Sequence, residues 1–99
     1  MYTYVDFYAE FRQSALMTKS AEKSYGRMRF AANLRSARLA AGLSQEDLAE
    51  KAGFHRSYVS QVERGITNIT VDNACRLADF LGVDLAVLFS ALDAENKAE

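Results

Sequence analysis

The sequence has no proline and no tryptophan, and it contains only one cysteine and one histidine. A single cysteine excludes an internal disulfide and a cysteine-based metal cluster. No run of about 18 apolar residues is present, so we expect no membrane-spanning helix and no membrane partner. The first residues also lack the basic start and apolar centre of a signal peptide. These absences make the cytoplasm the expected location.

Residues typical of enzymes are scarce as well. The sequence has no glycine-rich phosphate loop and no spacing typical of metal ligands. The carboxylates of Glu46, Asp47 and Glu50 are expected on a helix surface and not in a pocket. Cys75 is expected to be a small, buried side chain on a helix. We therefore predict a protein without catalytic activity, cofactor or metal.

The net charge is −1, but the charges are unevenly distributed. Residues 23–68 hold eight basic and four acidic residues, whereas residues 69–99 hold two basic and six acidic ones. A bound polyanion senses the local field within about 8–10 Å, which is roughly one Debye length. The middle of the chain could therefore bind nucleic acid although the whole chain is slightly acidic.

Helical periodicity, divided by glycines, predicts an all-α fold. Ser44 and Asp47 have the spacing of a capping box, and Thr70 and Asp84 are candidate N-caps for two later helices. Four glycines stand where a left-handed residue would end a helix, at Gly42, Gly53, Gly65 and Gly82. The expected helices are 24–41, 45–52, 56–63, 71–81 and 85–92.

Apolar residues spaced three and four apart mark the inward face of each helix. Helices of about two turns are not stable alone in water, so they must pack into one compact bundle. The side chains expected to face inward are Leu34, Ala37, Ala41, Leu48, Ala52, Val59, Val62, Ala74, Leu77, Ala78, Leu81, Leu85, Leu88 and Phe89. The sequence therefore predicts a five-helix domain over residues 23–93, followed by a frayed polar tail at 94–99.

Residues 1–22 form a separate N-terminal extension, which we expect to be helical. An aromatic stripe at helical spacing runs along it, through Tyr4, Phe7, Tyr8, Phe11 and Ala15. This stripe could pack against its own domain or a twin subunit, or it could bind another protein or a ligand. A start codon assigned too early is the third interpretation, because Met17 and Met28 could each begin the chain.

Residues 44–65 have the pattern of a helix-turn-helix. Ala49 is small enough for two helices to cross closely, and Gly53 allows a sharp turn four residues later. Val59 and Val62 would anchor the second helix to the core. Its N-terminal half, which enters the major groove in helix-turn-helix proteins, would then face outward. The outward residues are Arg56, Ser57, Ser60 and Gln61.

These outward side chains have the chemistry of base recognition. The guanidinium of Arg56 matches guanine O6 and N7, and the amide of Gln61 can pair with adenine. Ser57 can donate to a base or a phosphate. Gln45, at the start of the preceding helix, is expected to hold a phosphate, and Thr67 and Asn68 in the following loop could hold another.

Taken together, the motifs resemble the Cro/phage-repressor (XRE) family of helix-turn-helix regulators. The resemblance covers about residues 28–90. It is carried by Leu43-Ser44-Gln45, Leu48-Ala49, Ala52-Gly53, Val59-Ser60-Gln61-Val62-Glu63-Arg64-Gly65 and Leu81-Gly82-Val83. Within that family, His55-Arg56-Ser57-Tyr58-Val59-Ser60 with Asn68-Ile69-Thr70 is most similar to restriction–modification controller proteins. The extension 1–22 departs from the family pattern.

The resemblance implies a homodimer that binds a palindromic operator in double-stranded DNA. It implies base contacts from Arg56, Ser57 and Gln61, and phosphate contacts from Gln45, Tyr58 and Asn68. It also implies a structural ion pair between Arg38 and Glu63 and dimerisation through the last helices, at Leu85, Leu88 and Phe89. Tyr58 has packing as its alternative role, and His55 is expected to begin the recognition helix.

Acidic residues at the positions of Glu46 and Glu50 contact RNA polymerase in phage repressors, so the resemblance also suggests a polymerase contact. The alternative is an ordinary solvated helix face. The expected function is therefore a dimeric transcriptional regulator, an activator or a repressor. A second interpretation is an antitoxin that binds its own promoter and wraps a toxin with residues 1–22.

Overall fold

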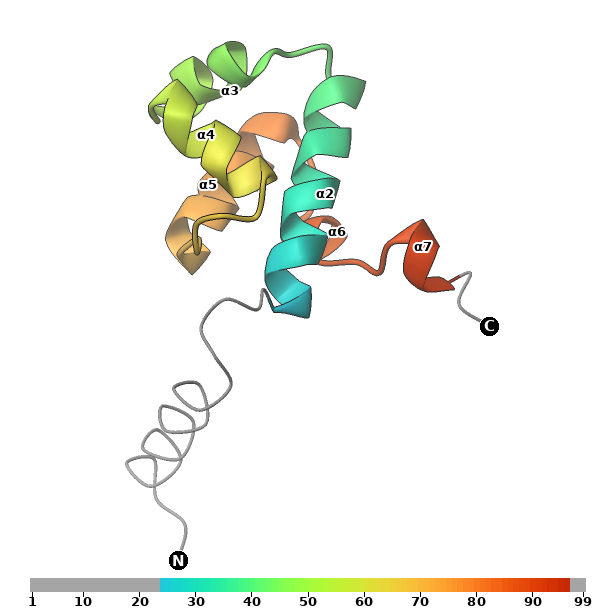
Figure 1. Ribbon diagram of the computed structural model, residues 1–99. Coiled ribbons are helices and arrows are strands. Elements are labelled where there is room, and N and C mark those ends of the chain that lie inside the picture. The colour runs from blue at the N-terminus through green and yellow to red at the C-terminus, as the bar shows by residue number, and fades with distance from the viewer. Residues whose placement is uncertain (1–23, 97–99) are drawn as a thin grey trace, which may run out of the picture.

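The computed structural model describes residues 24–96, and this range contains helices but no strand. The helices are α2 (Tyr25–Ala40), α3 (Gln45–Ala52), α4 (Arg56–Glu63), α5 (Val71–Leu81), α6 (Leu85–Leu88) and α7 (Asp93–Asn96) (Figure 1). The all-α class is confirmed, and α2 to α6 are the five helices that the sequence predicts. Every helix in this range is too short or too polar to cross a membrane.

The predicted helix caps determine where the elements begin and end. The Ser44 hydroxyl accepts a hydrogen bond from the backbone N–H of Asp47 (2.9 Å), and the Asp47 carboxylate accepts one from the N–H of Ser44 (3.0 Å). Thr70 and Asp84 cap α5 and α6 with one hydrogen bond each, which the side chain accepts from a backbone N–H of the first turn. Gly53 and Gly82 end α3 and α5 in the left-handed conformation, which side chains with a Cβ resist. The helix boundaries therefore follow from local sequence.

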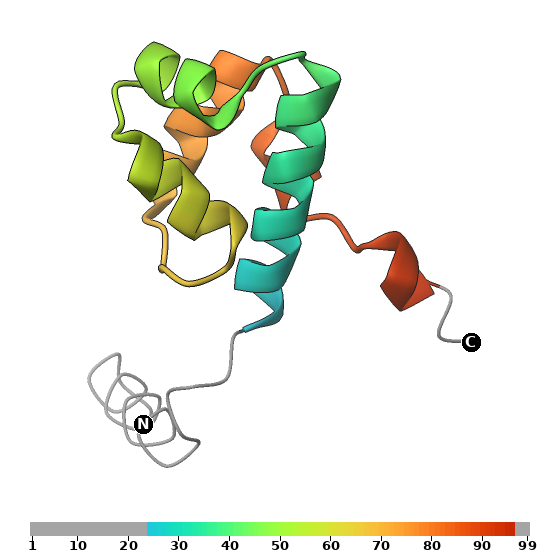
Figure 2. The ribbon, with the colours of Figure 1, turned by 45° about the horizontal axis from the view of Figure 1, so that its top comes forward.

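The core lies between α2 and the three helices α3, α4 and α5, which stand on one side of it (Figures 1 and 2). Five side chains from five helices are completely buried there: Leu34, Leu48, Val59, Leu77 and Leu88. Burying each side chain of this kind contributes about 1.5–3 kcal/mol. The predicted positions at Val62, Ala74 and Ala78 are buried as well, so periodicity identified most of the core.

Four side chains differ in burial from the sequence prediction. Ala41 is exposed, because it is the C-cap of α2 and lies beyond the last helical turn. Phe30 was not predicted to face inward, yet it is 1% exposed and packs on Phe89 with ring centroids 5.1 Å apart. Cys75 was expected to be buried but is half-buried, and Phe89 was expected to face inward but is 37% exposed.

The predicted length of the last helix, 85–92, is wrong. Helix α6 ends at Leu88, whose carbonyl accepts a hydrogen bond from the Asn33 amide (3.2 Å), as does the carbonyl of Ser90 (2.9 Å). The N–H of Leu92 donates to the Glu95 carboxylate (3.0 Å), as a residue before a new helix does. These side chains break the predicted helix in two and begin α7.

Helix α7 also corrects the expectation of a frayed tail at 94–96. The Arg29 guanidinium holds Glu95 with two donors, and the shortest N···O distance is 2.7 Å. The hydrogen bond from Arg29 lowers the pKa of Glu95.

The extension 1–22 lies outside the described residues, so its helix, its aromatic stripe and the antitoxin interpretation stay predictions.

Candidate nucleic-acid interface

Helix α4 has one buried face and one exposed face. Val59 and Val62 are 0% and 2% exposed and anchor the helix in the core. Arg56, Ser57 and Gln61 are exposed on the other side. Because residues one turn apart share a face of a helix, the two buried valines determine which side chains point away from the domain. The structure thus brings the three predicted base-contact residues to one exposed surface.

The first turn of α4 is organised by His55. Its Nδ1 accepts a hydrogen bond from the backbone N–H of Ser57 (3.3 Å) and lies 2.9 Å from the Ser57 hydroxyl. His55 is therefore the N-cap of α4, as expected from the sequence. The contact also fixes the Ser57 side chain at the start of the recognition helix.

The turn between α3 and α4 is braced from α5. The N–H of Phe54 donates to the carbonyl of Ala49 (2.8 Å), which closes the turn after the left-handed Gly53. The Phe54 ring packs on Tyr58 with centroids 5.0 Å apart, and the Arg76 guanidinium lies 5.1 Å from the Phe54 centroid. A cation over an aromatic face is attractive, so Arg76 stabilises the turn.

Arg38 and Glu63 form a buried ion pair that joins α2 to the end of α4. The Arg38 Nε and Nη2 donate to the two Glu63 oxygens at 2.6 and 3.0 Å, and Arg38 Nη1 donates to the Leu43 carbonyl (2.8 Å). The side chains of Arg38 and Glu63 are 8% and 3% exposed. The hydrogen bond that Arg38 donates to Glu63 raises the pKa of Arg38 above its ordinary value, so the guanidinium stays charged.

Gln45 belongs to the same cluster. Its Nε2 donates to Glu63 Oε1 (3.1 Å), which fixes the amide at the start of α3. One of the two amide hydrogens is used in this contact, and the other stays available for an outside acceptor. The cluster therefore connects the predicted phosphate-binding residue of α3 to the end of the recognition helix.

Tyr58 packs against its own domain, which was one of its two expected roles, and its phosphate contact stays a prediction. Its ring is half-buried against Phe54, whereas its hydroxyl accepts a hydrogen bond from the Asn73 amide of α5 (3.0 Å). The side chain packs through its ring and keeps a polar group at the edge of the interface.

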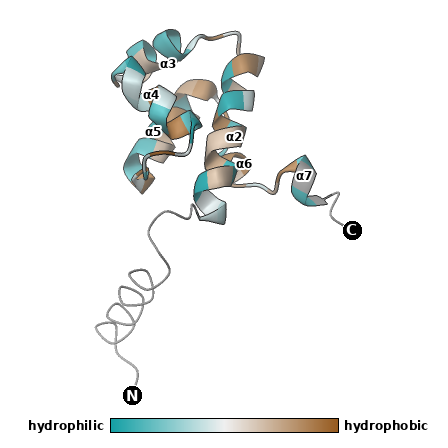
Figure 3. Ribbon diagram, in the orientation of Figure 1, coloured by the Kyte–Doolittle hydropathy of each residue, from teal (hydrophilic) through white to brown (hydrophobic). Residues whose placement is uncertain are grey.

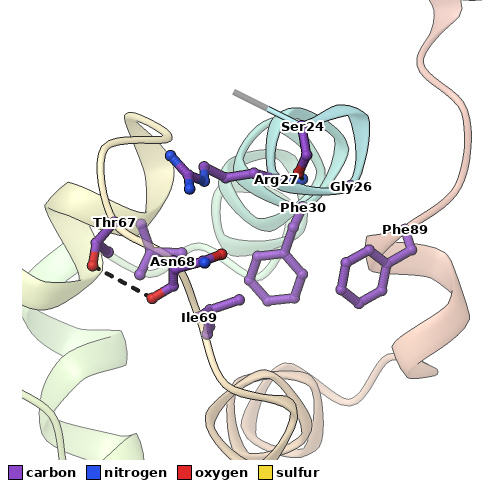
Figure 4. A pocket seen from close by; sticks show the side chains of 9 residues that line it. Ser24, Gly26, Arg27, Phe30, Thr67, Asn68, Ile69 and Phe89 are labelled. Carbon is purple, nitrogen blue, oxygen red and sulfur yellow. Dashed lines mark hydrogen bonds between the residues drawn. The ribbon is translucent and has the colours of Figure 1, made fainter. Parts of the chain in front are cut away.

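The loop after α4 carries the remaining predicted phosphate contacts. Asn68 is exposed and Thr67 is half-buried. Beside them lies a pocket of about 180 Å³ that the aromatic rings of Phe30 and Phe89 also line (Figure 4). The Arg27 side chain reaches from α2 toward this loop, and its Nη1 donates to the Gly65 carbonyl (3.5 Å). Arg27 therefore braces the start of this loop from α2.

Glu46 and Glu50 are exposed on α3, most of whose residues are hydrophilic (Figure 3). Together with His55 and Arg56 they line a hollow of about 390 Å³ at the edge of the recognition helix. The acidic side chains therefore adjoin the exposed face of α4 that carries Arg56, Ser57 and Gln61 without covering it. Among residues 24–96, no cluster of histidine, cysteine and carboxylate side chains could hold a metal ion.

Sequence reasoning missed three residues that shape this interface: Arg27, Asn73 and Arg76. Each acts on a residue at least 15 positions away in the sequence. The only available signal was the spacing of Asn73 and Arg76, which puts them one turn apart on α5. That spacing places them on one face but does not identify what the face contacts.

Comparisons with known proteins agree with this geometry. A helix-turn-helix family model matches residues 34–88. The control protein C.BamHI of Bacillus amyloliquefaciens is 40% identical over 58 residues, which are 58% of this chain and 72% of that protein. The control protein C.SmaI of Serratia marcescens is 39% identical over 67 residues, which are 68% of this chain and 80% of that protein.

Solved structures give the same result. The restriction-modification controller protein C.AhdI from Aeromonas hydrophila has a TM-score of 0.61 and 44% identity, covering 64% of this chain and 96% of that one. The hypothetical transcription factor NHTF from Neisseria has a TM-score of 0.67 and 36% identity, covering 80% of this chain and 94% of that one. The resemblance seen in the sequence is confirmed: the chain belongs to the XRE-type helix-turn-helix family of DNA-binding transcription regulators and is similar to restriction–modification controller proteins.

Proposed function

We propose that this protein is a cytoplasmic transcription regulator that binds a palindromic DNA operator as a homodimer and controls a restriction–modification system. The observation that carries the DNA-reading part is the exposed face of α4. Arg56, Ser57 and Gln61 share this face while Val59 and Val62 hold its opposite side in the core. The controller role is supported by the similarity to C.BamHI, C.SmaI and C.AhdI.

In the proposed complex, α4 enters the major groove and three side chains read bases. Arg56 would donate two hydrogen bonds to guanine, Gln61 would pair with adenine, and Ser57 would contact a base beside them. Each well-placed pair discriminates against a wrong base by about 1–3 kcal/mol. Such contacts favour one operator over other sequences.

Phosphate contacts would fix the register of the protein on the duplex without reading its sequence. Gln45 would use its second amide hydrogen, next to the free backbone N–H groups at the start of α3. Tyr58 would donate from its hydroxyl, and Thr67 and Asn68 would hold a phosphate from the following loop. In the sequence, Gln45 precedes the three proposed base-contact residues, Tyr58 lies between Ser57 and Gln61, and Thr67 and Asn68 follow them.

The proposed dimer would form through the C-terminal helices. Exposed apolar side chains are present there, with Phe80, Val87 and Phe89 exposed by 51%, 50% and 37%. Leu85 is half-buried, whereas Leu88 is 0% exposed inside its own domain and would support the interface only from behind. We therefore propose that Leu85, Val87 and Phe89 contact the second subunit at the dimer interface.

Glu46 and Glu50 are proposed to contact RNA polymerase, because both are exposed beside the reading face. A reporter assay with Glu46→Ala and Glu50→Ala tests this contact. Lower activation with unchanged operator binding is expected. Loss of operator binding, or full activation, would contradict the polymerase role.

The central experiment is selection of bound duplexes from a random DNA pool, followed by titration at several salt concentrations. A palindromic sequence bound at least about 10³-fold more tightly than unrelated duplexes is expected. Affinity should fall with salt with a slope of about −0.9 per neutralised phosphate. Arg56→Ala should abolish the preference, whereas Gln45→Ala should weaken all duplexes alike. Affinity independent of salt would refute the proposal.

Genomic context tests the controller role separately. An adjacent gene for a restriction endonuclease or a DNA methyltransferase would support it. Neighbouring genes unrelated to restriction and modification would favour a general regulator.

A further inference from the structure

We infer that Asn73 is a positioning residue for DNA binding, because it turns the Tyr58 hydroxyl into a hydrogen-bond donor aimed at a DNA phosphate. This inference rests on the proposed function, since it concerns one of the proposed phosphate contacts. It adds a residue from α5, a helix to which the sequence assigned only packing.

The direction of the hydrogen bond carries the argument. The Asn73 Nδ2 lies 3.0 Å from the Tyr58 hydroxyl oxygen. An amide nitrogen donates and does not accept, so the phenol oxygen must be the acceptor in this contact. The hydroxyl hydrogen of Tyr58 is left for a different partner. Within the described part of the chain, Tyr58 makes no other side-chain hydrogen bond.

The position of Asn73 is itself fixed. Its backbone N–H donates to the Thr70 hydroxyl (3.1 Å) in the N-terminal capping contact of α5. One turn later, Arg76 lies over the Phe54 ring, and Phe54 packs on Tyr58. Asn73 thus contacts the hydroxyl of Tyr58 directly, and Arg76 supports its ring through Phe54.

This arrangement suits a phosphate better than a base. A phenol whose oxygen already accepts a hydrogen bond is a polarised donor, because hydrogen bonds in a chain strengthen one another. A phosphate oxygen only accepts, and a donor to a charged acceptor makes one of the stronger hydrogen bonds. Tyr58 precedes the buried Val59, so its half-buried ring lies at the edge of the reading face. Its hydroxyl would therefore contact the DNA phosphate backbone beside the major groove.

A double-mutant cycle with Tyr58→Phe and Asn73→Leu tests the inference on the operator duplex recovered by selection. Each single variant should weaken binding about tenfold or more per subunit, which is the loss of one hydrogen bond to a charged group. The double variant should bind no more weakly than Tyr58→Phe alone. Losses that multiply in the double variant would overturn the inference, because Asn73 would then act independently of the hydroxyl.

Asn33→Leu is the matched control. It removes an equally half-buried amide, which holds the carbonyls of Leu88 and Ser90 and does not contact α4. This variant should lower stability and leave operator affinity unchanged at temperatures where it is folded and at protein concentrations where it is dimeric by size-exclusion chromatography, a condition needed because Leu88 and Ser90 flank Phe89 of the proposed dimer interface. A loss of affinity equal to that of Asn73→Leu would assign both effects to general destabilisation and overturn the inference.

Two further readouts separate positioning from a merely structural role. The slope of log affinity against log salt should stay unchanged in Asn73→Leu, because a neutral donor releases no counterion. Single methylphosphonate substitutions along the operator should include one that weakens the wild-type protein but not Tyr58→Phe or Asn73→Leu. A changed salt slope, or no such phosphate, would overturn the inference. If the wild-type protein showed no salt-dependent operator binding, the proposed function itself would fail instead.

Discussion

Replacing Glu63 by alanine should destabilise the protein strongly, although the residue is expected to make no contact with DNA. The substitution removes the two hydrogen bonds from Arg38 (2.6 and 3.0 Å) and the one from Gln45 (3.1 Å). Arg38 would remain charged and 8% exposed, with only the Leu43 carbonyl as its partner. Breaking a buried ion pair from one side costs about 3–5 kcal/mol.

That cost is large for a domain whose total stability is about 5–15 kcal/mol. Urea unfolding followed by far-ultraviolet circular dichroism measures it directly. With a slope of about 1.5 kcal/mol per M, the unfolding midpoint of Glu63→Ala should fall by roughly 2–3 M. The loss of stability comes from the Arg38 guanidinium, which stays buried without its Glu63 partner. Removing the positive charge as well should therefore remove most of the loss.

The double variant Arg38→Met with Glu63→Leu is the control for this reasoning. It replaces the pair by apolar side chains of similar volume, and such replacements are often neutral or stabilising. Its free energy of unfolding should therefore lie close to that of the wild type. A loss below about 1 kcal/mol in Glu63→Ala, or a double variant as unstable as the single one, would refute the argument from the buried charge.

Three other substitutions test local features of the fold. Gly53→Ala should cost about 1–2 kcal/mol, because φ is +78° and alanine resists the left-handed conformation, while the nearest atom to an added Cβ, Arg76 Nη1, is 3.9 Å away. Leu77→Ala should cost about 2–5 kcal/mol, because the side chain is 0% exposed in the core and leaves a cavity. Asp47→Asn should reduce the loss of stability in acid, because the hydrogen bonds from the backbone and side chain of Ser44 lower the pKa of Asp47. All three effects are measured by urea unfolding, the last one across pH.

The sign of the acid effect follows from the lowered pKa of Asp47. The native state binds this proton less readily than the unfolded chain, so the contribution is complete above the unfolded pKa of about 3.9. It is lost as the pH falls through the lower native pKa. Identical acid profiles for the wild type and Asp47→Asn would contradict the capping role. For Gly53, asparagine should be tolerated better than alanine, and the reverse order would contradict the conformational argument.

Local signals in the sequence predicted most of the fold. The capping box at Ser44 and Asp47 and the glycines at 53 and 82 act within a few residues, so reading the sequence located the helix ends. The break between α6 and α7 was missed because it depends on Asn33, which lies 55 residues before Leu88. The burial of Phe30 was missed for a similar reason, since its partner Phe89 comes from the other end of the domain.

The same distinction applies to the candidate interface. The exposure of Arg56, Ser57 and Gln61 follows from the two valines on the same helix, so periodicity was sufficient. The pairing of Asn73 with Tyr58 depends on how α5 crosses α4 and has no local signature. Side-chain contacts between helices are determined by packing, and no pattern within one helix specifies them.

The exposed face of α4 has a consequence for how such a protein diverges. In the described part of the chain, the side chains of Arg56 and Gln61 make no hydrogen bond and no ion pair, whereas Glu63 on the same helix is tied into the fold. Exchanging surface residues of this kind usually changes stability by less than about 0.5 kcal/mol. Under the proposed function, new operator preferences are therefore accessible by substitution at these positions without compensating changes in the core. Closely related copies could become mutually independent regulators in one cell in very few mutational steps.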